Sequence, residues 1–344
     1  MISPTPALRI LAVRFSSIGD IVLITPLLRA LKTRYPDCYL AVATKEEFAP
    51  LLRHNPNIDR VIEFAPSERL TRLARDLRAE RFTHHLDLHG SMRSRALRWL
   101  VRGRWHGYPK HRLARTTLIR TKRNIYRPGT PPVAERFFAA ARGLGVAPDG
   151  GPPDLYLDPE EREQARNWLS NRGLGEDRPV VVVAPMAAHF TKRWPLAHWQ
   201  ALVSTLTVSR VDIVVVGGPG DVAVCESVAD AGGTHAASAA GPTGLQGTAS
   251  LIEHAKLVVA GDTGVMHMST ALDTPVVALF GPTVKALGFF PYKARATVLE
   301  LDLACRPCSK MGGPTCPLGH HRCLIDIDHE DVAAAVEEWL GQTD

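Results

Sequence analysis

The strongest constraint on the fold of this chain is a repeated alternation of short apolar runs with longer amphipathic segments. The first run, residues 9–15 (RILAVRF), precedes a segment with apolar residues at helical spacing. Strands that alternate with helices form parallel sheets covered on both faces. In the N-terminal part we expect strands at 9–15, 39–44, 61–64 and 84–88, and helices at 21–34, 46–53 and 69–80.

The alternation stops in the middle of the chain and then begins again. Residues 103–153 are rich in Pro, Gly and Arg and show only a weak pattern. A chain of 344 residues exceeds what one hydrophobic core usually serves, so the restart predicts a second doubly wound α/β domain. Its expected strands are 179–184, 212–216, 257–260 and 276–280, and its helices are 160–171, 196–206, 222–231, 250–254, 265–272 and 331–340.

The positive charge of the chain is concentrated in one segment. The net charge is +6, and between Arg93 and Arg127 there are twelve Lys or Arg and no Asp or Glu. Such a field attracts anions, for example phosphorylated lipid, a membrane surface or nucleic acid, and the alternative is a solvated basic face. Nucleic acid is disfavoured, because no helix-turn-helix, zinc-finger or RNA-binding signature accompanies the charge.

The N-terminal apolar stretch does not have the features of a membrane span. Residues 8–31 are interrupted by Arg14, Asp20, Pro26 and Arg29. They also lack the small-residue cleavage site of a signal peptide. We therefore expect a cytoplasmic protein.

The loop after the first strand carries a carboxylate. Ligands of open parallel sheets bind at the carboxyl ends of the strands, so these loops are where chemistry is expected. Residues 16–20 (SSIGD) lack the spaced glycines of a dinucleotide fingerprint and the Gly-Lys-Ser/Thr of a P-loop. Asp20 is either a reactive group at the mouth of a cleft or a helix cap.

Two loops of the second domain have the composition of a nucleotide site. Thr191, Lys192 and Arg193 supply a hydroxyl and two cations after the strand at 179–184, which suits a diphosphate. After the strand at 212–216, Gly217 and Gly218 allow close approach of a ligand and Asp221 is suited to accept hydrogen bonds from ribose. The alternative for the second loop is a tight turn with a helix cap.

The strongest motif is Gly261-Asp262-Thr263-Gly264, where a strand runs into a turn that opens a helix. Backbone N–H groups and the positive end of the helix dipole make such a turn an anion site. Thr263 adds a hydroxyl and Gly264 leaves room. His267 lies one helical turn further on and can face the same ligand.

These motifs, in this order, resemble glycosyltransferase family 9, the heptosyltransferases of lipopolysaccharide core synthesis. The likeness covers nearly the whole chain. The matching pieces are Ser17-Ile18-Gly19-Asp20 with Thr25-Pro26-Leu27, Asn55-Pro56-Asn57-Ile58-Asp59, Lys192-Arg193-Trp194-Pro195, Gly217-Gly218-Pro219, Gly261-Asp262-Thr263-Gly264 with His267, and Phe280-Gly281-Pro282-Thr283.

The resemblance implies a GT-B fold with two Rossmann-like domains and a cleft between them. Residues 1–165 would bind the acceptor, residues 166–328 the nucleotide sugar, and a helix in 329–344 would cross back to the first domain. It also implies inverting transfer from ADP-heptose to the Kdo–lipid A inner core or to a heptose on it, with no cofactor required for catalysis.

By the same resemblance, Asp20 is the expected general base, and the residues of the second-domain loops bind the donor. The expected donor and phosphate ligands are Thr191, Lys192, Gly217, Gly218, Asp221, Asp262, Thr263, Gly264 and His267. The expected acceptor contacts are Ser17, Gly19, Arg120 and Lys122. We also expect peripheral contact with the inner membrane, a monomeric state and no nucleic-acid partner.

Four cysteines lie within nineteen residues near the C-terminus: Cys305, Cys308, Cys316 and Cys323. In a cytoplasmic protein this spacing favours a structural zinc site over disulfides, but the second pair is not a Cys-x2-Cys. Zinc, reduced thiols in a packed loop and disulfides all stay open. His320 and His321 are substitute ligands.

Three competing functions remain to be distinguished. One keeps the family and changes the donor to another nucleotide sugar of envelope polysaccharide synthesis. The second is a non-catalytic nucleotide- or lipid-binding homologue, against which the pairing of Asp20 with Lys192 argues. The third, an NAD-dependent oxidoreductase, is disfavoured because neither domain has a dinucleotide fingerprint.

Overall fold

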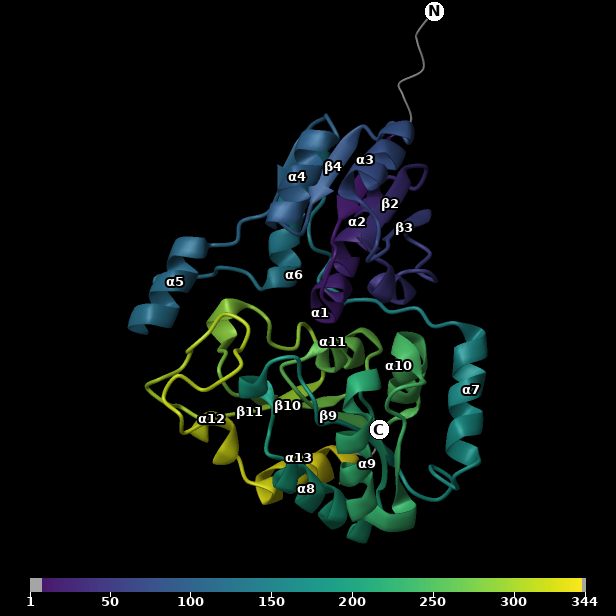
Figure 1. The fold of residues 1–344 in the computed structure, drawn as a ribbon, viewed down its shortest axis with the longest axis vertical. Coiled ribbons are helices and arrows are strands. Elements are labelled where there is room, and N and C mark those ends of the chain that lie inside the picture. Colours follow the sequence, from purple (N-terminus) through teal and green to yellow (C-terminus); the bar gives the residue numbers. More distant parts are fainter. Residues whose placement is uncertain (1–7, 342–344) are drawn as a thin grey trace, which may run out of the picture. The chain divides into compact units, whose positions relative to one another are not determined.

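The computed structural model describes residues 8–341, which form two compact α/β units (Figure 1). Unit 1 comprises residues 8–110 and 133–156, and unit 2 comprises residues 111–132 and 157–341. The chain therefore enters unit 2 with helix α5 (Arg112–Thr121) and returns to unit 1 with α6 (Val133–Arg136). The sequence had placed residues 111–132 in the first domain and the boundary at 165/166.

Unit 1 is built on a five-stranded parallel sheet in the order β3-β2-β1-β4-β5. The four predicted strands are present, and β5 is an additional strand that the basic stretch concealed. The strands are β1 (Arg9–Val13), β2 (Tyr39–Lys45), β3 (Arg60–Phe64), β4 (His84–Asp87) and β5 (Trp105–Gly107).

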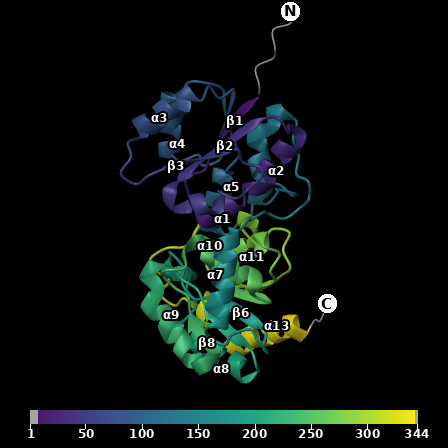
Figure 2. The same ribbon diagram turned by 90° about the vertical axis from the view of Figure 1, so that its right-hand side faces the viewer.

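Helices cover both faces of this sheet, with α3 and α4 on one side and α2 on the other (Figure 2). The helix expected at 21–34 is two helices, and the one expected at 46–53 is a short 3-10 helix that contains Pro50. The elements are α1 (Ile18–Val22), α2 (Thr25–Arg34), η1 (Glu46–Leu51), α3 (Leu70–Ala79), α4 (Met92–Leu100) and η2 (Phe137–Leu144).

Unit 2 contains a six-stranded parallel sheet in the order β11-β10-β9-β6-β7-β8. The predicted strands are again present, and the short β8 and the outer β11 are additional. The strands are β6 (Val180–Ala184), β7 (Asp212–Val215), β8 (Ala236–Ser238), β9 (Leu257–Gly261), β10 (Val276–Phe280) and β11 (Ala296–Glu300).

The central strands of unit 2 are buried along their whole length, as expected for a parallel sheet with helices on both faces. Side chains of β6 such as Val181 and Val183 join the core formed with α8, α9 and α13. Helices α7, α10 and α11 pack together elsewhere in the unit. These helices are α7 (Pro159–Ser170), α8 (Leu196–Val208), α9 (Val222–Ala229), α10 (Gly244–His254), α11 (Gly264–Ala271) and α13 (His329–Gly341), and the shorter elements are η3 (Phe190–Lys192), η4 (Pro219–Asp221), η5 (Asp230–His235), η6 (Lys285–Leu287) and α12 (Arg322–Ile325).

The C-terminal helix α13 belongs to unit 2. It packs against α8 and against strands β9 and β10, and Trp339 Nε1 donates a hydrogen bond to Thr297 Oγ1 at 3.0 Å. The structure thus shows packing of α13 on the second sheet, and the expected crossing to the first domain stays a prediction. Within residues 8–341, none of the helices has the length and apolarity that crossing a bilayer demands.

The direction of strand order reverses once in each sheet. In unit 1 the reversal lies between β1 and β4, and in unit 2 it lies between β6 and β9. Ligands of doubly wound sheets bind outside the carboxyl ends of the strands at such a point. The loops after these four strands are therefore the first places to look for a site.

Candidate functional site

In unit 1, Asp20 lies in helix α1, just beyond the carboxyl end of β1. Its carboxylate forms an ion pair with Arg14, in which Nη2 lies 2.5 Å from Oδ2. Only 7% of the Arg14 side chain and 19% of the Asp20 side chain are exposed. Asp20 is therefore a mostly buried, ion-paired carboxylate at the reversal point of the sheet.

Arg14 also holds the backbone on both sides of this point. Its Nε donates to the carbonyl of Ser16 at 2.8 Å, and its Nη1 donates to the carbonyl of Leu88 at 2.6 Å. The sequence motifs did not single out Arg14. The available signal was its position in the apolar run 9–15, because an ionised side chain in a buried strand needs a charged or polar partner.

Two other side chains surround the ion pair. Burial, with the positive charges of Arg14 and Lys110, lowers the pKa of His89 to about 4. Burial also raises the pKa of Tyr108, whose hydroxyl lies 3.5 Å from Arg14 Nη1. Both are neutral at physiological pH, so Arg14 supplies the positive charge next to Asp20.

The two residues expected to contact the acceptor through this loop have distinct positions. Ser17 is the N-terminal cap residue of α1, makes no side-chain capping bond, and points its hydroxyl to Asp20 Oδ2 at 3.4 Å. Gly19 is buried inside α1. The hydroxyl of Ser17 is thus placed beside the carboxylate, whereas Gly19 has no side chain to offer and serves the packing of the helix.

In unit 2, the structure brings Lys192 and Asp262 together from the loops after β6 and β9. Lys192 Nζ lies 2.6 Å from Asp262 Oδ2 and donates to the Asp262 carbonyl at 2.9 Å. Thr283 donates its hydroxyl to the same carboxylate oxygen at 2.7 Å. Asp262 is 7% exposed, so its buried carboxylate positions the Lys192 ammonium group. Thr283 is the residue of this network that we did not predict from sequence.

Thr263 opens helix α11 as its N-terminal cap residue. In the part of the chain that the structure describes, its Oγ1 is buried and has no hydrogen-bond partner. The first N–H groups of a helix lack partners inside the helix, and Gly264 follows directly. An unsatisfied hydroxyl, helix N–H groups and Lys192 are together suited to hold a phosphate. His267 is only 4% exposed in the same helix.

Thr191 is held by a segment far away in the sequence. Its hydroxyl accepts from the N–H of Gly313 at 2.8 Å, and its carbonyl lies 3.2 Å from His321 Nε2. Phe190 and His321 also form a ring contact with centroids 5.1 Å apart. The cysteine-rich segment therefore supports the Lys192 loop.

Most of the residues predicted to bind the donor in the loop after β7 also have a role in packing or in the turn. A Cβ on Gly217 would lie 2.6 Å from Cys225 Sγ, so packing alone requires glycine there. Asp221 accepts the N–H of Gly218 at 2.9 Å and closes the turn before α9. Asp221 is partly buried, and its predicted contact with ribose stays a prediction.

The two basic residues proposed to contact the acceptor belong to unit 2, not to the first domain. Lys122 follows α5 with a φ of 63° and donates to the carbonyl of Pro307 at 2.7 Å. Arg120 is exposed in the last turn of α5. Lys122 thus fastens α5 to the cysteine-rich segment, which gives it a structural role that the sequence did not indicate.

All six cysteines are free, so the structure does not support disulfides in the cysteine-rich segment. Burial raises the pKa of Cys323 to about 11 and raises that of Cys308, and the other thiols of the set add to both shifts. The four thiols are thus near one another. Within residues 8–341, however, no three Cys, His, Asp or Glu side chains are arranged to hold a metal ion.

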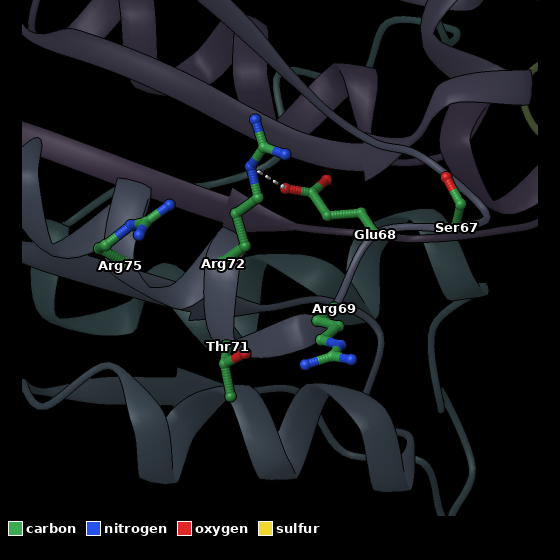
Figure 3. Close-up of a pocket in the computed structure, with 6 residues that line it drawn as sticks. All are labelled: Ser67, Glu68, Arg69, Thr71, Arg72 and Arg75. Atoms are coloured by element: carbon green, nitrogen blue, oxygen red, sulfur yellow. Dashed lines mark ion pairs between the residues drawn. The ribbon is translucent and has the colours of Figure 1, made fainter.

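An open cavity of about 390 Å³ lies at the N-terminal end of α3 in unit 1 (Figure 3). Arg72 Nε lies 3.8 Å from Glu68 Oε1 beside it. None of the residues predicted from the sequence lines this cavity, so it is separate from the Asp20 site. Its lining residues are Ser67, Glu68, Arg69, Thr71, Arg72 and Arg75.

Comparison with known proteins places this architecture. The model of glycosyltransferase family 9 (heptosyltransferase) matches residues 70–318. Lipopolysaccharide heptosyltransferase 2 of Salmonella typhimurium is 27% identical, with 97% of this chain and 99% of that protein covered. Such coverage leaves no large part of either chain unmatched.

Solved structures agree with the sequence match. A family 9 glycosyl transferase from Veillonella parvula has a TM-score of 0.82 at 24% identity and covers 98% of both chains. The ADP-heptose lipopolysaccharide heptosyltransferase II of Escherichia coli has a TM-score of 0.76 at 26% identity, covering 97% of this chain and 99% of that chain. The expected GT-B class, with two Rossmann-like units, is confirmed. Since the family model matches well over half of the residues, the chain belongs to glycosyltransferase family 9, the heptosyltransferases.

Proposed function

We propose that this glycosyltransferase transfers L-glycero-D-manno-heptose from ADP-heptose to the inner core of lipopolysaccharide, with inversion at the anomeric carbon. The observation that supports the donor assignment is the arrangement at the ends of β6 and β9, where the Lys192–Asp262 pair lies next to the unsatisfied Thr263 hydroxyl and the start of α11. The E. coli structure, named for ADP-heptose, supports the choice of donor. The acceptor is Kdo–lipid A or a heptose already attached to it.

The proposed reaction is a single displacement. The acceptor hydroxyl oxygen attacks the anomeric carbon while the bond from that carbon to the β-phosphate oxygen breaks, and ADP leaves with the bonding electrons. Asp20 takes the proton of the attacking hydroxyl as general base. Arg14 is a positioning residue, because its ion pair and its two bonds to backbone carbonyls fix the Asp20 carboxylate.

The leaving diphosphate gains negative charge as the bond breaks. Lys192 offers an ammonium group, Thr263 a hydroxyl, and Gly264 a backbone N–H at the positive end of α11. Fixed donors of this kind stabilise a transition state without reorganising. We infer that these groups meet the electrostatic demand of the leaving group, so that catalysis needs no metal.

Nucleotide selectivity tests the donor assignment directly. We expect ADP to raise the melting temperature of the protein, because ADP binds at Lys192 and Thr263 only when the protein is folded. We expect UDP, GDP and NAD to raise the melting temperature much less. Thermal unfolding followed with each nucleotide in turn measures this. Stabilisation by UDP alone would assign a different nucleotide sugar, while transfer of heptose from ADP-heptose to truncated lipopolysaccharide acceptors identifies the acceptor.

The metal-free mechanism and the cysteine-rich segment are tested together. We expect untagged protein to keep its full kcat after dialysis against a chelator. We expect elemental analysis of the untagged protein before dialysis to find far less than one zinc per chain, since the four thiols are not arranged to hold a metal ion. Loss of turnover that zinc restores would contradict the mechanism. Stoichiometric zinc without an effect on turnover would instead assign a structural site to Cys305, Cys308, Cys316 and Cys323.

The acceptor also suggests where the enzyme works. We propose that it acts as a monomer at the cytoplasmic face of the inner membrane, in peripheral contact with the bilayer. The supporting observation is the basic stretch between Arg93 and Arg127, since basic segments are attracted to anionic headgroups.

A further inference from the structure

Helices α3 and α4 of unit 1 lie side by side on one face of the sheet (Figures 1 and 2). They direct Leu73, Leu77 and Leu97 into the core against β1 and its neighbours. Arg78 at the end of α3 donates to the carbonyl of Leu100 at the end of α4, which ties the two helices together. Their outer surfaces therefore form one continuous face.

Large apolar side chains stand on this outer face. Met92 is 86% exposed and Trp99 is 84% exposed. They are seven residues apart in α4, two helical turns, so they lie on the same side of the helix with Arg95 between them. The opposite side of α4 already supplies Leu97 to the core, so core packing does not account for this exposed stripe.

The face around the stripe is strongly basic. Arg72 and Arg75 of α3, which line the cavity of Figure 3, have side chains 70% and 73% exposed. Glu68, which precedes α3, lies 3.8 Å from Arg72, and Asp76 within α3 lies 3.6 Å from Arg75. Glu80 is the C-terminal cap residue of α3. The arginines that the two helices and their flanking loops carry are Arg69, Arg72, Arg75, Arg78, Arg81, Arg93, Arg95, Arg98 and Arg102.

We propose that this α3–α4 face docks on an anionic phospholipid bilayer, with Trp99 and Met92 inserted at the headgroup level. Indole rings partition to the membrane interface, and arginines on the same helix pair with anionic headgroups. The face is the outer side of two helices, which suits a flat surface. The inference rests on the proposed membrane contact and assigns it to named residues.

Vesicle flotation of the full-length protein tests this face. Wild-type protein floats with vesicles of phosphatidylcholine and phosphatidylglycerol, and much less with phosphatidylcholine alone. The double substitution Met92→Ser with Trp99→Ser lowers the bound fraction at least tenfold, and Arg95→Gln alone weakens binding about fivefold at low salt. The matched control is Val208→Ser with Arg210→Gln, because Val208 is also an exposed apolar residue, 83% exposed, in unit 2.

Several outcomes would overturn the assignment. They are absence of wild-type binding to the anionic vesicles, equal binding of both vesicle types, or a double variant that floats like the wild type. A wild-type dimer that the double variant dissociates, with vesicle binding intact, would assign the face to a second copy of the chain. Heptose transfer to a delipidated core oligosaccharide separates membrane docking from the proposed function. We expect the double variant to keep this activity. Absence of the activity in the wild type would contradict the proposed function and not the docking face.

Discussion

Replacement of Asp20 by Asn is expected to lower kcat about 100- to 10,000-fold, the range that loss of a general base typically produces. Asparagine has nearly the same shape and still offers an oxygen to Arg14, so the ion-pair geometry is retained in part. What is lost is the group that takes the proton of the acceptor hydroxyl. Initial rates with donor and acceptor both saturating measure the effect.

Two other variants separate proton transfer from positioning. Ser17→Ala removes the hydroxyl 3.4 Å from Asp20 and should change kcat only slightly. Arg14→Lys keeps the charge but loses the fork that holds both the carboxylate and the backbone, so kcat should fall while donor KM stays near its wild-type value. Near-normal turnover of Asp20→Asn would remove Asp20 from the role of base.

Replacement of Lys192 by Ala is expected to act on both stability and donor binding. Asp262 would keep a buried negative charge without its partner, which costs about 3 kcal/mol when a buried pair is broken. The diphosphate would lose a charge-assisted bond, and ADP affinity should fall by at least tenfold. Urea unfolding and calorimetric titration with ADP measure the two effects separately.

A double variant distinguishes the two contributions. Lys192→Met with Asp262→Asn removes both charges, so no unpaired ion is left and much of the lost stability should return. ADP binding should not return, since the ammonium group is still missing. Recovery of ADP affinity in the double variant, or wild-type affinity in Lys192→Ala, would show that Lys192 only supports the fold.

The central strands of both sheets could be predicted from the sequence alone. Runs such as residues 180–184 (VVVVA) are buried on both faces, and their composition fits no other position in an α/β fold. Strand β5 and helix α4 were not predicted, because the signal that identified the central strands is a pattern of apolar residues. Strand β5 has only three residues and lies within the basic stretch, and α4 carries arginines and an exposed tryptophan, so neither shows an apolar period.

The sequence also placed the candidate residues at the carboxyl ends of their strands, because a turn with glycine or a carboxylate after an apolar run is a local signal. It did not reveal which of them meet. Lys192 and Asp262 are seventy residues apart, and only the pairing of β6 with β9 brings them within 2.6 Å. Thr191 with Gly313, 122 residues away, is a second such case.

Arg14 and α13 show most clearly what tertiary structure decided. From the sequence, Arg14 was one charge in an apolar run. The turn between β1 and α1 pairs it with Asp20, and the pairing of β4 with β1 brings the Leu88 carbonyl to its guanidinium group. The sequence predicted a helix at 331–340 but did not show what it packs against, and its apolar side chains join the core of the second sheet. Local patterns record which side chains are to be buried, whereas the identity of the partner depends on chain segments that meet only after folding.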